Sequence, residues 1–88
     1  MHPKTPNDPS AIGLAALAAA LSDERRAQRF LQLTGIGTDE LRERLGDPSL
    51  LAALLLFLEA HEPDLIAVAE QVGMAPADLV AARKALEA

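Results

Sequence analysis

Residues 50–58 read Leu-Leu-Ala-Ala-Leu-Leu-Leu-Phe-Leu, and this run decides the fold because it is the most apolar stretch of the chain. A helix built from it would be apolar on every side, which is typical of a helix at the centre of a protein. Its nine residues fall well short of the roughly 20 that span a bilayer. The preceding Asp47-Pro48-Ser49 favours a helix start, because Asp caps free backbone N–H groups and Pro suits the first turn. We therefore expect a buried central helix that ends near Ala60.

Helix start and stop signals recur on both sides of this run. Asp, Ser, Thr and Pro favour helix starts, whereas Gly favours helix ends because it adopts the left-handed conformation without strain. The second helix should place Ala27, Phe30, Leu31 and Thr34 on its inner side. The expected helices run from Pro9 to Leu21, from Ser22 to Gly35, from Thr38 to Gly46, from Pro63 to Gly73 and from Pro76 onward.

Composition supports one helical domain. The chain has 88 residues, half of them apolar, and the apolar residues are mostly Leu and Ala, with Phe30 and Phe57 as the aromatic residues. Leu and Ala favour helix over strand, and a chain of this length buries one shared core. We predict an all-α fold, a compact bundle of about six short helices. Residues 1–8 should form a flexible tail and residues 9–88 a single helical domain.

The signals also suggest an internal repeat. Asp8-Pro9-Ser10 recurs as Asp47-Pro48-Ser49, and Gly35-Ile36 recurs as Gly73-Met74. This pattern is consistent with two duplicated three-helix units that pack face to face. The alternative is that helix starts and ends look alike in any helical protein, and the sequence leaves both open.

Charge restricts the partners. The net charge is -5, of which residues 1–47 carry -1 (six basic, seven acidic) and residues 48–88 carry -4 (two basic, six acidic). This negative net charge disfavours the binding of nucleic acid through a uniform electrostatic field. Arginine forks suit carboxylates and phosphates, so a cluster in the first half is a candidate docking patch for an acidic partner. The alternative, which we favour, is a solvated face with pairs such as Glu40 with Arg44. The candidate patch consists of Arg25, Arg26, Arg29, Arg42 and Arg44.

Residues 65–86 have the spacing of a helix-turn-helix motif. Ala69 would allow two helices to approach, and Gly73 would allow the turn. The second helix would present Ala77, Ala81 and Lys84, together with Val80, and these side chains offer little to read base edges. A nucleic-acid-binding regulator is therefore the alternative function rather than the leading one.

Catalysis and metal binding have little support. The chain has no cysteine, which excludes disulfides and thiolate chemistry. His61 lies near Glu59, Glu62 and Asp64, but a helical zinc motif needs a second His where Leu65 stands. Histidine and acidic side chains at such a corner are explained by the helix dipoles. We predict that the protein is not an enzyme and has no catalytic residue, metal or cofactor, with a metal or minor enzymatic site at His61 and Glu62 as the remaining alternative.

The apolar stretch from Ala11 to Leu21 must also be weighed as a secretory signal. Asp8 and two prolines occupy the region that should be positively charged in such a signal. We therefore expect a helix here and a cytoplasmic location.

Several segments together resemble a known family. These are residues 29–36 (Arg-Phe-Leu-Gln-Leu-Thr-Gly-Ile), Asp39-Glu40-Leu41-Arg42, Asp47-Pro48 and the Leu-rich helix ending in Phe57-Leu58. Over residues 9–86 they resemble a family of short alphaproteobacterial proteins classed as a domain of unknown function. The resemblance implies a cytoplasmic, bacterial, helical protein, and it transfers no active site.

The leading functional hypothesis is a small non-catalytic protein–protein interaction module. The chain has more apolar residues than a core of this size is expected to hide. An apolar groove between helices, or a self-complementary face, would then bind a partner helix or a second copy of the chain. No membrane span or small-molecule substrate is expected.

Overall fold

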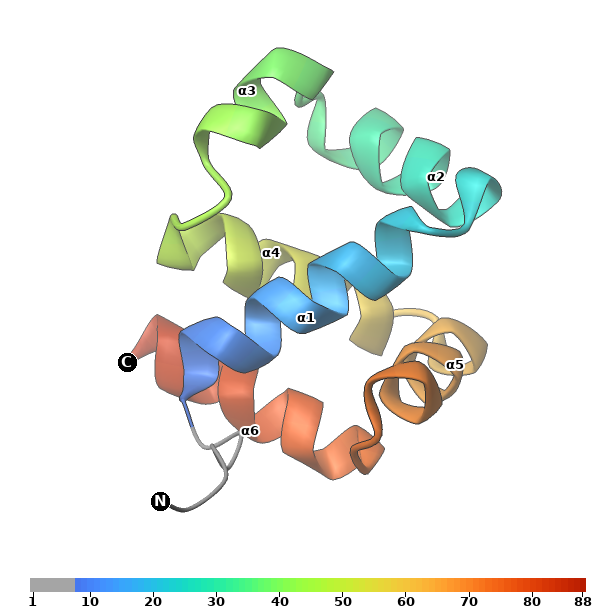
Figure 1. The fold of residues 1–88 in the computed structure, drawn as a ribbon, viewed down its shortest axis with the longest axis vertical. Helices are drawn as coiled ribbons and strands as arrows, with labels where there is room; N and C mark the ends of the chain where they lie inside the picture. The colour runs from blue at the N-terminus through green and yellow to red at the C-terminus, as the bar shows by residue number, and fades with distance from the viewer. Residues whose placement is uncertain (1–7) are drawn as a thin grey trace, which may run out of the picture.

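The computed structural model describes residues 8–88, which form an all-α bundle without a strand (Figure 1). This confirms the predicted fold class. The expected tail lies outside the described residues except for Asp8. The helices are α1 (Pro9–Leu21), α2 (Glu24–Thr34), α3 (Thr38–Glu43), α4 (Pro48–Glu59), α5 (Glu62–Val72) and α6 (Pro76–Glu87).

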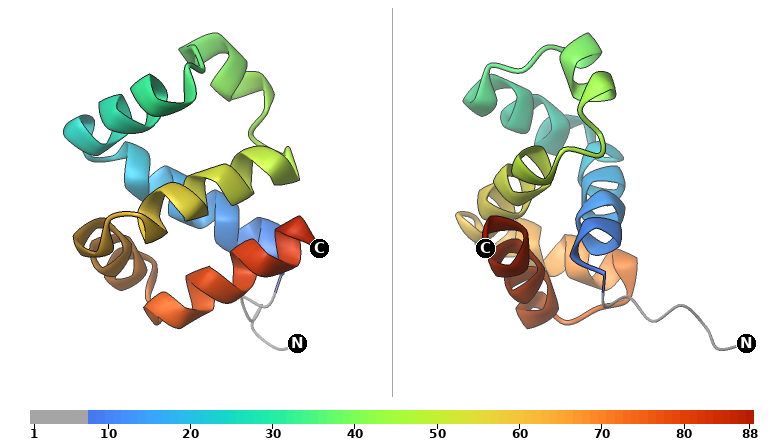
Figure 2. Two further views of the ribbon diagram at one scale, coloured as in Figure 1. Left: turned by 180° about the vertical axis from the view of Figure 1, so that it is seen from behind. Right: turned by 90° about the vertical axis from the view of Figure 1, so that its left-hand side faces the viewer.

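Helix α4 is central, as its sequence predicts. Leu50, Leu54, Leu55 and Leu58 have no exposed surface, and α4 packs against α1, α5 and α6. In both views of Figure 2 it runs between the α2–α3 segment and α6. Gly13 lets α1 approach closely, since a Cβ atom added there would lie 3.0 Å from the Leu51 Cβ.

Most helix ends follow the predicted signals. Asp8 and Asp47 each accept a hydrogen bond from the backbone N–H two residues later, and Gly35 and Gly73 end α2 and α5 with positive φ. The prediction that Ser22 starts the second helix was wrong. Its hydroxyl donates to the Ala19 carbonyl and thereby closes α1, so that Asp23 takes over as the cap of α2.

Helices α2 and α3 lie together at one end of the molecule (Figures 1 and 2). Phe30 attaches α2 to the bundle, because it is fully buried and its ring meets the Phe57 ring edge-on at 5.4 Å between centroids. Ala27 and Leu31 are half-buried beside it. Thr34 was expected on the inner side but is exposed, and its hydroxyl donates instead to the Phe30 carbonyl.

Helices α5 and α6 meet at a sharp turn. Gly73, with φ of 76°, precedes a 97° change of direction between the two helices. The angle lies in the range of helix-turn-helix motifs. No single helix among residues 8–88 is long and apolar enough to cross a membrane, and α5 and α6 reach the necessary length and composition together only across this bend.

Candidate functional site

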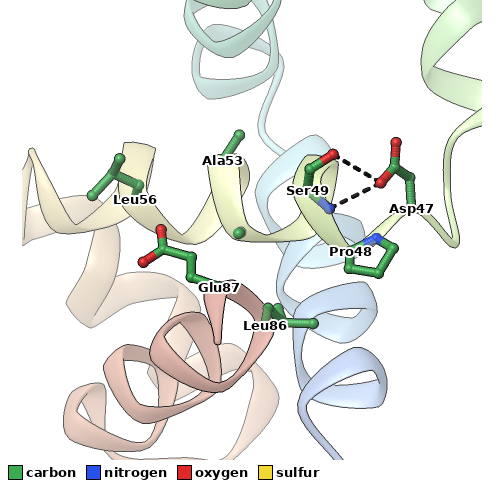
Figure 3. Close-up of a pocket in the computed structure, with 8 residues that line it drawn as sticks. Asp47, Pro48, Ser49, Ala53, Leu56, Leu86 and Glu87 are labelled. Atoms are coloured by element: carbon green, nitrogen blue, oxygen red, sulfur yellow. Dashed lines mark hydrogen bonds between the residues drawn. The ribbon is translucent and has the colours of Figure 1, made fainter.

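A groove runs along one side of α4. Ser49, Ala52, Ala53 and Leu56 are spaced i, i+3, i+4 and i+7, so they share one face of the helix. Leu86 near the end of α6 forms the facing wall (Figure 3). The space has a volume of about 610 Å³, and Asp47, Pro48 and Glu87 complete its lining. We call it the α4–α6 groove.

The groove exists because α4 is covered on most of its circumference but not on all of it. Small side chains form the floor, with Ala52 buried and Ala53 half-buried. Leu56 stands at one end with 51% of its surface exposed, although the neighbouring Leu55 has none exposed. A helix that is apolar all round therefore presents one apolar face that this chain covers only in part. The sequence predicted the central helix but gave no signal of which face stays open.

Two acidic side chains, Asp47 and Glu87, line the groove. Asp47 Oδ1 accepts hydrogen bonds from the Ser49 N–H at 2.9 Å and the Ser49 hydroxyl at 2.8 Å, and Oδ2 accepts from Arg44 Nε at 3.0 Å. These bonds, those of Ser49 first, hold the pKa of Asp47 below its usual value. Glu87 is the second carboxylate, and none of the described residues that line the groove carries a positive charge.

Each of two arginines near the groove binds two carboxylates. Arg44 pairs with Asp47 and, at 3.2 Å, with Glu40. Arg83 pairs with Glu59 and, at 2.7 Å, with Glu87. The pKa of Arg44 is raised, mainly by its hydrogen bond to Asp47, and that of Arg83 mainly by its hydrogen bond to Glu59. With one positive and two negative charges, each group of three has a formal net charge of -1.

A second polar cluster joins α2 to α5. Asp64 is 6% exposed, accepts hydrogen bonds from Arg26 Nε at 3.0 Å and from Arg29, and lies 2.9 Å from His61 Nδ1. Burial alone would raise the pKa of Asp64, but hydrogen bonds from Arg26 and His61 and the charge of Arg29 outweigh it and lower the pKa. The Arg29 guanidinium also lies 5.4 Å from the centroid of the Phe57 ring. We call these residues the Asp64 cluster.

The predicted arginine patch is divided by these contacts. Arg26 and Arg29 belong to the Asp64 cluster, whereas Arg44 pairs with Asp47 at the end of the groove. These three side chains therefore do not form one patch. Arg42 lies 3.6 Å from Asp39 on the exposed side of α3. Among residues 8–88, Arg25 has no carboxylate within ion-pair distance and is exposed. The sequence placed His61 and Asp64 at one corner, but it gave no sign of the contacts of Asp64 with Arg26 and Arg29 on α2, which lie 38 and 35 residues away along the chain.

The comparison with family models now gives the affiliation. Residues 6–88, nearly the whole chain, match the family described as "Protein of unknown function (DUF3572)". The chain belongs to the DUF3572 family. Comparisons of this DUF3572 chain with curated proteins and with solved structures give no match. The expected resemblance to a domain of unknown function is confirmed by the family match.

The described residues of this DUF3572 chain offer few other groups for binding a metal or a ligand. No group of three or more His, Asp or Glu side chains within residues 8–88 is arranged to hold a metal ion. In the same part of the chain every fully buried side-chain nitrogen or oxygen has a hydrogen-bond partner. The exposed side chains of α6 include Ala77, Ala81 and Lys84 as well as Asp78 and Glu87, and Val80 is half-buried. Large apolar side chains are exposed at Leu56 in the α4–α6 groove and also at Leu14, Leu33, Leu45 and Ile66. Leu56 differs from an isolated exposed side chain because it lines a space of about 610 Å³.

Proposed function

We propose that this DUF3572 chain is a small non-catalytic protein–protein interaction module that binds a helix of another protein in the α4–α6 groove. The observation that carries the proposal is Leu56, a half-exposed leucine on the central helix of the bundle. The alphaproteobacterial origin and cytoplasmic location implied by the family resemblance belong to the same proposal.

The physical support comes from the shape and chemistry of the groove. In helix-in-groove recognition the bound helix inserts apolar side chains spaced by three or four residues, and Ala52, Ala53 and Leu56 offer them an apolar floor. Covering Leu56 with a partner side chain removes apolar surface from water, which favours association at roughly 25 cal/mol per Å². The alanines Ala52 and Ala53 leave room for side chains larger than their own.

A non-catalytic role agrees with where the ionisable side chains lie. Asp64, Arg26 and Arg83 are the well-buried charged groups, and each is occupied by an oppositely charged neighbour. A reactive site needs such groups directed at a space where a substrate fits. The groove is instead lined mainly by alkyl side chains.

The nucleic-acid alternative has support in the 97° angle between α5 and α6. The exposed side chains of α6 add little to that support, because its alanines offer no hydrogen bond to a base edge and Lys84 is accompanied by Asp78 and Glu87, which would repel phosphate. We therefore keep protein binding as the proposal.

A matched pair of variants tests it. Leu56→Gln removes the apolar side chain from the groove, whereas Ile66→Gln makes a comparable change on α5, where Ile66 is 45% exposed. Both tagged variants and the wild type are incubated with a lysate of the cells that make the protein, after urea unfolding has shown all three folded. We expect a partner that the wild type and Ile66→Gln retain and Leu56→Gln loses. Retention of the same proteins by all three would contradict the proposal.

A further inference from the structure

We infer that the occupant of the α4–α6 groove is an amphipathic helix with basic side chains beside its apolar face. The inference rests on the function proposed above and adds the chemistry of the partner. Its basis is the placement of the carboxylates around the groove.

The two acidic groups stand at opposite ends of α4. Asp47, which shares Arg44 with Glu40, directly precedes the first residue of α4, and Glu59, which pairs with Arg83, is its last residue. From Asp47 to Glu59 the helix rises about 18 Å, at 1.5 Å per residue. Glu59 follows Leu56 by three residues, so it continues the same face of the helix. A partner helix of about three turns would therefore have a net negative group near each of its ends.

These carboxylates can accept further hydrogen bonds from a partner. Asp47 and Glu87 are 36% and 46% exposed in their side chains, and Glu40 is 51% exposed. Glu40 and Glu87 each accept from arginine through one oxygen, and the other oxygen accepts no hydrogen bond from a described residue. Lysine or arginine side chains of a partner can bind there without breaking the internal pairs.

The same charges argue against a second copy of the chain in this groove. In a two-fold dimer the groove of one copy would face the groove of the other, since such an interface uses the same surface twice. That arrangement brings acidic groups of equal sign together, and residues 48–88 carry -4 overall with Arg83 and Lys84 as their basic residues. A basic partner gains attraction at the places where a second copy would suffer repulsion.

Two synthetic helices separate charge from apolar contact. Both have Leu and Ala at positions i, i+3, i+4 and i+7, and the remaining positions are Lys in one peptide and Glu in the other. Amide chemical shifts of the full chain locate binding, and fluorescence anisotropy measures affinity at about 50 mM and about 300 mM NaCl, because salt screens exposed charges. We expect shifts at Ala53, Leu56 and Leu86 with the Lys peptide. Its affinity should exceed that of the Glu peptide by roughly tenfold at low salt and by less at high salt.

A matched pair of double variants tests the groove charges themselves. Asp47→Asn with Glu87→Gln removes both lining charges, and Asn preserves the cap of α4. Glu43→Gln with Glu70→Gln removes two exposed charges elsewhere and gives the same net charge. The first pair should lower the affinity for the Lys peptide by about fivefold, and the second should change it by less than about twofold.

The outcomes distinguish the two proposals. Binding of both peptides in the groove with equal affinity, or equal losses in the two double variants, would overturn the basic partner and leave the docking function intact. Concentration-dependent shifts at Leu56 without any peptide would identify a second copy and overturn the basic partner as well. Absence of shifts at Ala53 and Leu56 with either peptide would overturn both the inference and the proposed function.

Discussion

The halves α1–α3 and α4–α6 share the start of their first helix and the end of their second helix, but they pack differently. Asp8 and Asp47 cap α1 and α4 with φ, ψ of -78°, 114° and -77°, 118°. Gly35 and Gly73 end α2 and α5 at φ of 73° and 76°. The repeated sequence signals therefore correspond to repeated local geometry.

The third helix of each half accounts for the difference. Helix α6 has 12 residues, buries Leu79 and Ala82, and packs against α4 and α1. Helix α3 has 6 residues, buries Leu41, and stays with α2 at the end of the molecule (Figure 2). Local signals thus determine where a helix begins and ends, while its length and apolar content determine how many of its side chains reach the core.

The largest expected effect contrasts the corresponding leucines of these two helices. Leu79→Ala empties a fully buried site in the bundle and should lower the free energy of unfolding by about 3 kcal/mol. Leu41, which is 8% exposed under a thinly packed helix, should cost about 1 to 2 kcal/mol when changed to Ala. Urea unfolding measures both. Equal losses would mean that α3 is as well packed as α6 and would break the comparison.

The next effect concerns the Asp64 cluster, which compensates for the thin packing of α2 by tying it to α5. Asp64→Ala leaves the largely buried Arg26 without its carboxylate and should cost about 2 to 3 kcal/mol. Hydrogen exchange should show that α2 loses protection more than α6 does. Equal loss of protection in both helices would show that the cluster supports the whole bundle rather than α2.

Lowering the pH should test the contribution of Asp64 to stability in a second way. The folded-state pKa of Asp64 is lowered from 3.8, so its contribution to stability is fully present above about pH 5 and is lost as the pH falls below about 4. Asp64→Asn cannot lose that contribution, and its free energy of unfolding should fall less steeply than that of the wild type over this range. The difference between the two proteins should therefore shrink on acidification. Parallel pH profiles would contradict the lowered pKa.

The smallest expected effect tests the shared helix ends. Gly35→Ala and Gly73→Ala each place a Cβ atom at positive φ, where nothing lies within 4 Å to clash with it. Each should lower the free energy of unfolding by about 1 kcal/mol, since the cost comes from the backbone alone. Thermal unfolding measured by circular dichroism compares them. Losses that differ by more than about 1 kcal/mol would show that the two ends are not equivalent.

The sequence allowed the fold to be predicted further than the site. Residues 50–58 placed α4 at the centre, and Gly35 and Gly73 marked helix ends, because apolar pattern and backbone conformation are local properties. Ser22 was misassigned because a serine after a helix can bond either forward or backward. The Asp64 cluster and the open face at Leu56 depend on which helices meet in space, and no local pattern in a single sequence encodes that.

The most direct test of the open face on α4 uses the absence of cysteine from the chain. Leu56→Cys and Leu54→Cys place a single thiol on the half-exposed and on the fully buried side of the same helix. Labelling with a thiol reagent under native conditions should be at least about 100-fold faster for Leu56→Cys, since Leu54→Cys reacts only when the structure opens. Equally slow labelling of both variants would show that the chain covers this face itself, and the α4–α6 groove would then not be a docking site.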